Sequence, residues 1–263
     1  MQFLCINLPG SRLRRESMEA QLQALNIAVE WVPGVTASEI PEAELQGMCD
    51  MGFQRNVNDR LFMPGEIGCS LAHLNAYRFM LSRNLAWAVI LEDDVVLDAN
   101  LVAAVDAAAL LLDDTRPEVL LLNQARRVFA DTRQAVLPGY SIAEVSSARL
   151  AWGYLLNAAA AQAILAGNCP VRFLADDWKR IRYYCNCRIS AVIPPLVGER
   201  VDLVSDIRGP DFRKLRRRPS LGSRLRRLPL KLSRLLQKAN RRVVRTTEAE
   251  RTLSNPVDIP RQQ

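Results

Sequence analysis

A short run, residues 87–91, carries apolar side chains at every position and therefore on both sides of an expected strand. Such a run is typical of a central strand in a sheet that helices cover on both faces. Glu92, Asp93 and Asp94 follow it directly. Because ligands of open α/β sheets bind beyond the carboxyl ends of strands, this triplet is the first candidate for a functional site. Strand alternation predicts Glu92 and Asp94 on one side and Asp93 on the other.

The rest of the chain alternates expected strands with expected helices, which favours a parallel or mixed α/β sheet. Apolar runs bounded by turn residues predict further strands at residues 2–8, 28–32, 119–122, 150–156 and 189–193. Helical spacing of apolar residues predicts helices after Ser11 and at residues 65–81, 101–112 and 158–166. Residues 33–64, in which Pro and Gly are scattered among polar residues, are expected to form irregular surface connections.

The positive charge of the chain is concentrated in one segment. The net charge is +7, but residues 208–251 hold 16 Lys or Arg against three acids, so the remainder is mildly acidic. A length of 263 residues fits one large domain with an appendage. We therefore predict an α/β domain at residues 1–208 and a basic extension at residues 209–263.

The basic segment calls for a partner of its own. Leucines keep helical spacing amid Arg and Lys, at positions 225, 228, 232, 235 and 236. This pattern predicts an amphipathic helix that lies on an anionic membrane surface through residues 209–251. A partly disordered, solvated tail is the alternative. Nucleic acid is not an expected partner, because no aromatic residue follows Phe212 and no binding motif is present.

Two further features bear on the compartment. Residues 1–10 lack the basic opening and the long apolar core of a secretory signal, and no uninterrupted apolar stretch is long enough to span a bilayer. We expect a cytoplasmic protein, peripheral on the inner face of the cytoplasmic membrane. The six cysteines are then expected to be free thiols. Cys185 and Cys187 lack the second ligand pair of a structural zinc site, and His73 is the only histidine.

Two groups of polar side chains suggest a binding site. Three adjacent carboxylates raise one another's pKa unless a cation or a basic group compensates, and such oxygen ligands suit Mg²⁺ or Mn²⁺ carrying a nucleotide phosphate. The alternative is a solvated acidic loop. On the expected helix 65–81, a polar face combines Glu66, Ser70, His73 and Tyr77.

The sequence around these residues resembles a known family. The runs MPGEIGCSLAHLNAYRFML at residues 63–81 and LAWAVILEDDVVL at residues 85–97 are similar to the bacterial lipopolysaccharide glycosyltransferases of glycosyltransferase family 25. The family's initial INL strand is also present, as Ile6, Asn7 and Leu8. Weaker similarity continues through residues 151–157 and 176–177, so the resemblance covers residues 3–207.

The resemblance implies a GT-A-like catalytic domain that moves a sugar with inversion at the anomeric carbon. It implies that UDP-galactose is the donor and galactose the transferred sugar. The implied acceptor is a lipid-linked saccharide, the core of a lipooligosaccharide or lipopolysaccharide. Glu92, Asp93 and Asp94 take the place of the family's metal and diphosphate motif, for Mn²⁺ or Mg²⁺. The expected donor-binding residues are Ile6, Asn7, Leu8, Arg12, Arg14, Glu66, Ser70 and His73. Residues 9–11 depart from the family pattern before Arg12.

An enzyme of this kind needs a base that removes the proton of the acceptor hydroxyl. Asp176 and Asp177 are the candidates, since they follow the apolar run at residues 173–175. Alternatively, these acids complement the dipole of a helix that begins near Trp178. Asp206 is a reserve candidate as base or metal ligand.

Two other functions compete with the glycosyltransferase. A metal-dependent phosphohydrolase or nuclease also uses clustered acids, but such enzymes usually hold two metals with several dispersed Asp and His ligands, and this chain has one histidine. A membrane-associated scaffold without activity is the third hypothesis, which retention of the acidic triplet speaks against.

Overall fold

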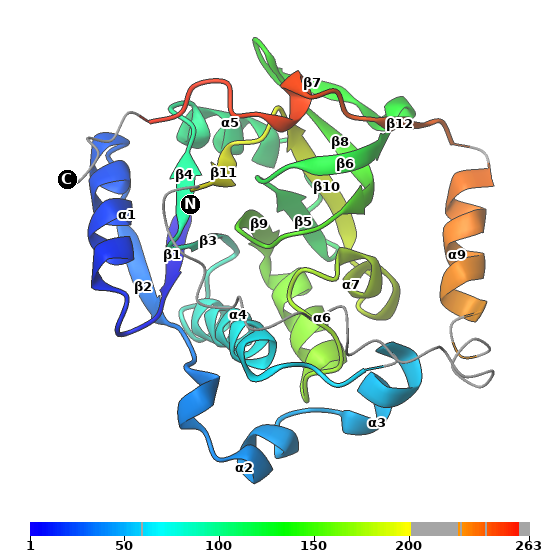
Figure 1. Ribbon diagram of the computed structural model, residues 1–263. Coiled ribbons are helices and arrows are strands. Elements are labelled where there is room, and N and C mark those ends of the chain that lie inside the picture. The colour runs from blue at the N-terminus through cyan, green and yellow to red at the C-terminus, as the bar shows by residue number, and fades with distance from the viewer. Residues whose placement is uncertain (59, 201–225, 227, 240, 258–263) are drawn as a thin grey trace.

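The computed structural model describes residues 1–58, 60–200, 226, 228–239 and 241–257. Its centre is a large mixed sheet that helices cover on both faces (Figure 1). Across the sheet the strands follow the order β12 (Val243–Arg245), β6 (Ala125–Phe129), β8 (Tyr140–Ala148), β10 (Arg188–Ile193), β5 (Glu118–Leu121), β9 (Gly153–Asn157), β3 (Trp87–Glu92), β1 (Gln2–Asn7) and β2 (Val29–Pro33). β7 (Gln134–Leu137) pairs with β8, and β4 (Val95–Leu97) pairs with β11 (Val197–Glu199) in a separate small sheet.

The sheet mixes parallel and antiparallel pairs. β2, β1 and β3 are parallel neighbours, as are β5 and β10, whereas β9 runs antiparallel between β3 and β5. This arrangement is a mixed α/β fold of the GT-A-like kind, which confirms the predicted fold class. The predicted strands within residues 2–8, 28–32, 87–91, 119–122, 150–156 and 189–193 are all present, with small shifts of their ends.

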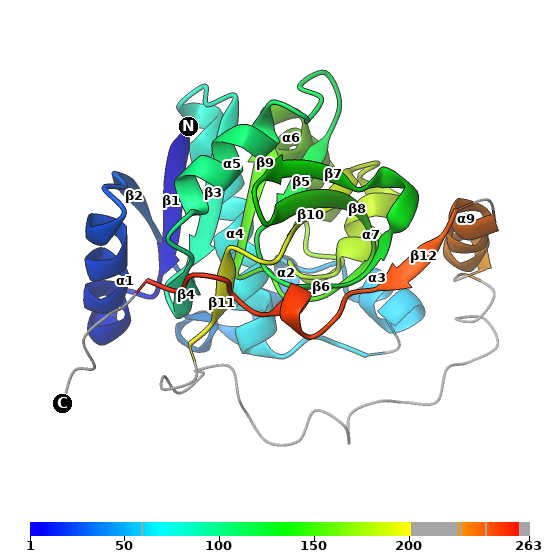
Figure 2. The same ribbon diagram turned by 90° about the horizontal axis from the view of Figure 1, so that it is seen from above.

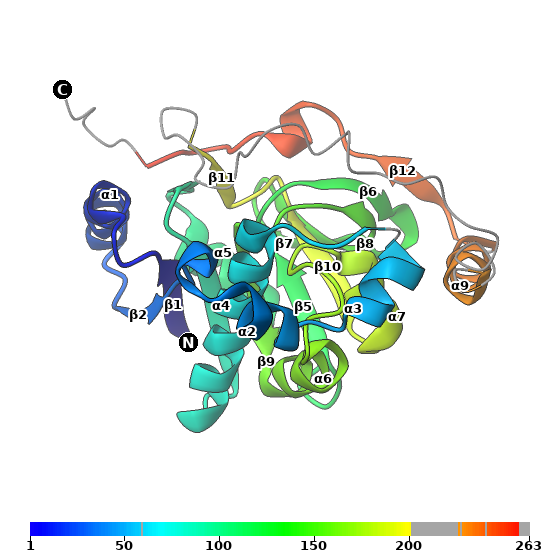
Figure 3. The same ribbon diagram turned by 60° about the horizontal axis from the view of Figure 1, so that its bottom comes forward.

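Alternating side chains of the central strands build two cores, one on each face of the sheet. Phe3 and Cys5 of β1 face the core that contains α1 (Arg12–Ala24) and α5 (Leu101–Ala109). Leu4 and Ile6 face the core on the other side, which contains α4 (Pro64–Ser82), α6 (Ala158–Asn168) and α7 (Trp178–Tyr184). Figures 2 and 3 show these layers from other directions. The two-sided burial explains why these strands read as continuous apolar runs.

Several segments differ from the sequence-based expectation. Residues 33–64 are not wholly irregular, because they hold short helices: η1 (Ala37–Glu39), α2 (Glu42–Gly47), α3 (Met51–Phe53) and the π-helical turn η2 (Gln54–Asn58). β4, β6, β7, β8, β11 and β12 were not predicted. In β6 the arginines at positions 126 and 127 are exposed, so this strand lacks an apolar run. Helix α5 ends at Ala109 rather than at residue 112.

Helix α9 (Leu228–Ala239) contains four of the five leucines of the predicted helix, and the fifth, Leu225, lies outside the described residues. α9 ends before Val244, which lies in β12 and pairs with Val128 of β6. The chain then passes through η5 (Ala249–Arg251) and returns to the body, where buried Asp98 accepts hydrogen bonds from Asn255 N and Tyr140 Oη, both at 2.8 Å. The predicted boundary at residue 208 and the basic residues 209–225 lie outside the described residues. No helix in the described part of the chain is long and apolar enough to cross a bilayer.

Close packing of α4 against the segment after β2 gives a test of the fold. A Cβ on Gly68 would lie 2.5 Å from the carbonyl oxygen of Val35. Gly68→Ala is therefore expected to lower the free energy of unfolding by about 1–3 kcal/mol, despite the better helix propensity of alanine. Urea unfolding followed by circular dichroism measures this.

Gly10→Ala is the matched control, because a Cβ at Gly10 meets nothing within 4 Å. Equal unfolding midpoints for the two variants would mean that α4 does not pack as closely as described.

Candidate functional site

A cavity of about 540 Å³ opens at the carboxyl ends of β1 and β3. α4 and the segment after β2 form its other walls. Residues that line it include Ile6, Leu8, Gly10, Ser11, Arg14, Gly34 to Glu39, Pro64, Gly65, Gly68, Cys69, Ala72, His73, Glu92, Asp93 and Asp94. The structure therefore brings the acidic triplet together with four predicted donor-binding residues: Ile6, Leu8, Arg14 and His73. We refer to this cavity, where the sequence predicts that the donor binds, as the donor pocket.

Asp93 is held by groups from β1 and α1. Parallel pairing places Ile6 opposite Glu92, so the next residue, Asn7, lies beside Asp93. Asn7 Nδ2 donates a hydrogen bond of 2.6 Å to Asp93 Oδ2, and Arg14 Nη1 lies 3.6 Å from Asp93 Oδ1. Burial raises the pKa of Asp93, while Asn7 and Arg14 act in the opposite direction. Asn7 thus supports the acidic triplet and is not among the residues that line the pocket.

Asp94 is less completely neutralised. Its Oδ2 lies 3.3 Å from Arg14 Nη1, but its buried Oδ1 has no hydrogen-bond partner among the described residues. Burial, followed by the charge of Glu92, raises the pKa of Asp94 to about 6. A buried carboxylate oxygen without a partner, next to a second carboxylate, fits a hard divalent cation such as Mg²⁺ or Mn²⁺.

Glu92 has different neighbours from the two aspartates, which corrects the predicted alternation. The strand β3 ends at Glu92, and residues 93 and 94 form a turn, so both aspartates reach Arg14. Glu92 instead faces α4, where its Oε1 lies 3.2 Å from His73 Nε2. The prediction that Glu92 and Asp94 share one side, with Asp93 on the other, is wrong because a turn replaces the extended strand.

His73 belongs to a buried chain of polar groups. Its Nδ1 lies 2.7 Å from Tyr154 Oη, which in turn lies 2.7 Å from Tyr77 Oη. His73 is 2% exposed and its ring stacks against Tyr154. Sequence reasoning placed His73 and Tyr77 on one helix face but missed Tyr154, which comes from β9. The resemblance at residues 151–157 was the only sequence signal for it. Burial raises the pKa of Tyr77 and Tyr154.

Besides Asn7, three predicted donor-binding residues are not among those that line the pocket. Glu66 caps the start of α4 by accepting from Met63 N at 2.9 Å and forms a bidentate ion pair with Arg60. Ser70 Oγ donates to the carbonyl oxygen of Glu66 at 2.9 Å, and exposed Arg12 pairs with Glu16. Their assignment to donor binding remains a prediction.

A second cavity, of about 510 Å³, contains both predicted base candidates. It lies between the end of β8, α7 and α9, and we refer to it as the α9 pocket. Asp177 caps α7 by accepting from Arg180 N at 3.1 Å and also pairs with the Arg180 guanidinium. The alternative interpretation, an acid that supports a helix beginning at Trp178, thus describes what Asp177 does in the structure.

Asp176 has a different environment from its neighbour. It accepts from Leu150 N at 3.4 Å. Burial is the main cause that raises its pKa, and the charges of Asp177, Glu92 and Glu66 add to the effect. Asp176 lines the α9 pocket, and the charge of Glu92, which lines the donor pocket, contributes to its raised pKa. Asp206 lies outside the described residues.

The mixed sheet and the acidic pocket at its carboxyl edge define the class of GT-A-like α/β proteins. The chain belongs to glycosyltransferase family 25, described as LPS biosynthesis protein, whose sequence profile matches residues 1–178. This membership confirms the resemblance that the motifs suggested and makes the chain a member of a family of glycosyltransferases.

Several relatives of this chain are animal proteins. Inactive glycosyltransferase 25 family member 3 of Homo sapiens is 30% identical over 185 residues, which cover 67% of this chain and 30% of that protein. A glycosyltransferase 25 family member of Drosophila melanogaster is 33% identical over 97 residues, 36% of this chain and 16% of that protein. Procollagen galactosyltransferase 2 of Homo sapiens is 24% identical over 186 residues, 67% of this chain and 29% of that protein. The matched segment thus spans less than a third of each relative.

The raised pKa of Asp94 makes stability depend on pH in the metal-free protein. The folded state favours the protonated carboxyl, with a pKa of about 6 against an ordinary value of 3.8. Protonation of Asp94 therefore stabilises the folded state fully below the ordinary pKa, and this stabilisation is lost as pH rises through about 6. Between about pH 4.5 and 7.5, the wild type is therefore expected to lose roughly 2 kcal/mol of unfolding free energy relative to Asp94→Asn.

Urea unfolding in the presence of a chelator at both pH values measures this difference. Asp106→Asn, at an exposed position on α5, serves as the control and should follow the wild type at both pH values. An Asp94→Asn variant that also follows the wild type would show that Asp94 is not desolvated as described.

Proposed function

We propose that this chain transfers a sugar from a nucleotide-sugar donor bound in the donor pocket to an acceptor that enters through the α9 pocket. The observation that carries the proposal is the buried Asp94 Oδ1, which has no hydrogen-bond partner in the described part of the chain, in a pocket that also contains Asp93 and Arg14. Asp93 and Asp94 would hold Mn²⁺ or Mg²⁺, which neutralises the charge that develops on the leaving diphosphate. Arg14 orients both carboxylates from the first turn of α1.

Further support for the donor and the acceptor comes from the family. Procollagen galactosyltransferases of Homo sapiens and Xenopus laevis are relatives, so we propose galactose from UDP-galactose as the transferred group. The family description names lipopolysaccharide biosynthesis, which favours the core of a lipooligosaccharide or lipopolysaccharide as the acceptor. Membership in a glycosyltransferase family favours transfer over the phosphohydrolase or nuclease that clustered acids alone would allow.

Asp176 is the carboxylate that we propose as the base. It takes the proton from the acceptor hydroxyl, whose oxygen then attacks the anomeric carbon as the bond to the diphosphate breaks, with inversion. Burial raises its pKa above the ordinary value, which favours acceptance of a proton, and it lines the α9 pocket. Asp177 is already engaged by Arg180, so it supports α7 instead.

Binding and transfer measurements on three variants test these roles. Calorimetry should show that UDP binds in the presence of Mn²⁺ and that Asp94→Asn weakens binding by at least about tenfold, because one carboxylate of the cation site is lost. Asp176→Asn should bind UDP as the wild type does and should lower kcat by about 10²- to 10⁴-fold, since the base is removed.

Asp177→Asn is the matched control for the base, because asparagine also caps helices and should leave both measurements nearly unchanged. The proposal fails if no uridine nucleotide binds with or without Mn²⁺. If Asp177→Asn lost transfer and Asp176→Asn kept it, the base would be Asp177 and not Asp176.

Membrane attachment is the second part of the proposal and concerns α9. Four leucines on one side of this helix are 56–68% exposed: Leu228, Leu232, Leu235 and Leu236. Exposed Arg226 and Lys231 accompany them, within the basic segment 209–251. An apolar stripe with neighbouring cations suits an anionic bilayer surface, where each basic residue contributes about 1 kcal/mol. We propose that the protein is peripheral on the inner face of the cytoplasmic membrane and meets a lipid-linked acceptor there.

Replacing the four exposed leucines of α9 by Gln should abolish most binding to vesicles that contain phosphatidylglycerol, because the apolar stripe is lost. Vesicle cosedimentation measures this. Leu110→Gln on the body is the control, since Leu110 is 86% exposed and lies away from α9. Unchanged binding of the four-leucine variant at the same salt concentration would place the anchor elsewhere. Deleting residues 209–263 is a less clean test, because it also removes β12.

A further inference from the structure

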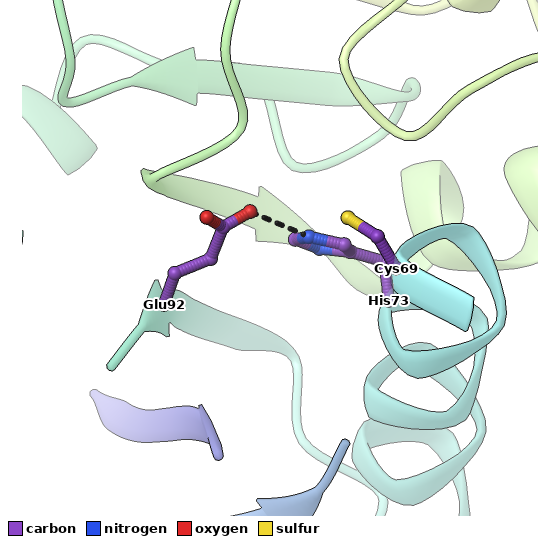
Figure 4. A group of neighbouring side chains, drawn as sticks. All are labelled: Cys69, His73 and Glu92. Atoms are coloured by element: carbon purple, nitrogen blue, oxygen red, sulfur yellow. Dashed lines mark hydrogen bonds and ion pairs between the residues drawn. The ribbon is translucent and has the colours of Figure 1, made fainter. Parts of the chain in front are cut away.

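Cys69, His73 and Glu92 converge on one point in the wall of the donor pocket. Cys69 and His73 are one helical turn apart on α4, so they share a face, and Glu92 approaches from the end of β3 (Figure 4). One ligand atom of each residue lies within 4.8 Å of the other two. His73 Nε2 and Glu92 Oε1 are only 3.2 Å apart.

We propose that these three side chains form a site for Zn²⁺ or a related borderline-soft divalent cation. The donor set combines a sulfur, a nitrogen and an oxygen, which suits zinc and does not suit Mg²⁺. At the usual bond lengths, a tetrahedral zinc ion requires its ligand atoms to be about 3.3–3.8 Å apart. The present separations of up to 4.8 Å would close to that range by a movement of roughly 1 Å.

The surroundings of His73 favour ligation through Nε2. Ligating histidines generally donate their other ring N–H to an oxygen, which fixes the ring orientation. Here Tyr154 Oη lies 2.7 Å from Nδ1, and Tyr77 Oη lies 2.7 Å from Tyr154 Oη. With the Nδ1 proton donated to Tyr154, and the Tyr154 proton to Tyr77, the Nε2 lone pair is directed towards Glu92.

The site differs from the proposed Mn²⁺ or Mg²⁺ site in its ligands and shares its pocket. Asp93 and Asp94 face Arg14, whereas Glu92 faces α4. All three proposed ligands line the donor pocket, so a fourth coordination position faces the pocket, where water completes the tetrahedron. The cation enters by the same opening. Binding replaces the proton of the Cys69 thiol, which is released to solvent.

Cobalt spectroscopy of the full chain tests this proposal without any nucleotide. Co²⁺ added to chelator-treated protein should give a near-ultraviolet charge-transfer band from thiolate to cobalt. Zn²⁺ should then remove the band at about one equivalent because it binds such ligands more tightly than Co²⁺, whereas Mg²⁺ should not. Cys69→Ser should lose the band, and Cys169→Ser, at an exposed cysteine, should keep it.

Two further variants keep the test independent of folding and of the proposed function. Glu92→Gln should retain the band, because the thiolate remains, but should weaken Co²⁺ binding by at least about tenfold. Removing a hydrogen-bond partner of a metal ligand already costs that much affinity, and Glu92 is itself a proposed ligand. The double variant Asp93→Asn with Asp94→Asn should bind Co²⁺ as the wild type does, even if it no longer binds UDP with Mn²⁺. Absence of the band in the wild type, or its persistence in Cys69→Ser, would overturn the proposal.

Discussion

The parallel pairing of β1 with β3 determines the chemistry of the donor pocket. Its register sets Ile6 opposite Glu92, so Asn7 meets Asp93, and α1, which follows β1, brings Arg14 to both aspartates. One guanidinium and one amide face two carboxylates that the fold withdraws from water. Burial, followed by the charge of Glu92, outweighs this compensation and raises the pKa of Asp94 to about 6. The sheet thus gathers negative charge at a place where the proposed cation would compensate it.

The sequence allowed prediction of the strands that are buried on both faces and missed most of the others. β1, β3, β5, β9 and β10 carry apolar runs because helices cover both sides of them. β6 and β7 carry exposed polar residues, so no run marks them. In β8, Tyr140 and Ile142 face one core and Ala143 and Val145 face the other, so the strand shows neither a continuous apolar run nor a period-two pattern.

Within the site, residue types were predictable and contacts were not. The motif identified the acidic triplet, but only the end of β3 at Glu92 decides that Glu92 turns to His73 while the aspartates turn to Arg14. Tyr154 lies 81 residues from His73 in the sequence, and only the sheet pairing brings them together. Asp176 and Asp177 are neighbours in the chain with different surroundings, because the first residue of α7 is Trp178 and makes Asp177 the cap.

Helix α9 connects the two halves of the proposed function. Leu230, Ser233 and Gln237 face the α9 pocket, and Leu230 is 2% exposed, whereas the stripe of leucines that includes Leu232 and Leu236 faces outward. A bilayer that covers this outward stripe would therefore lie one helix away from the pocket that contains Asp176. An acceptor with a lipid end and a saccharide end has these two requirements at once, an apolar surface and a polar cavity beside it. If the proposed function holds, the geometry of α9 suits an acceptor that stays in the membrane while its terminal sugar reaches Asp176, the proposed base.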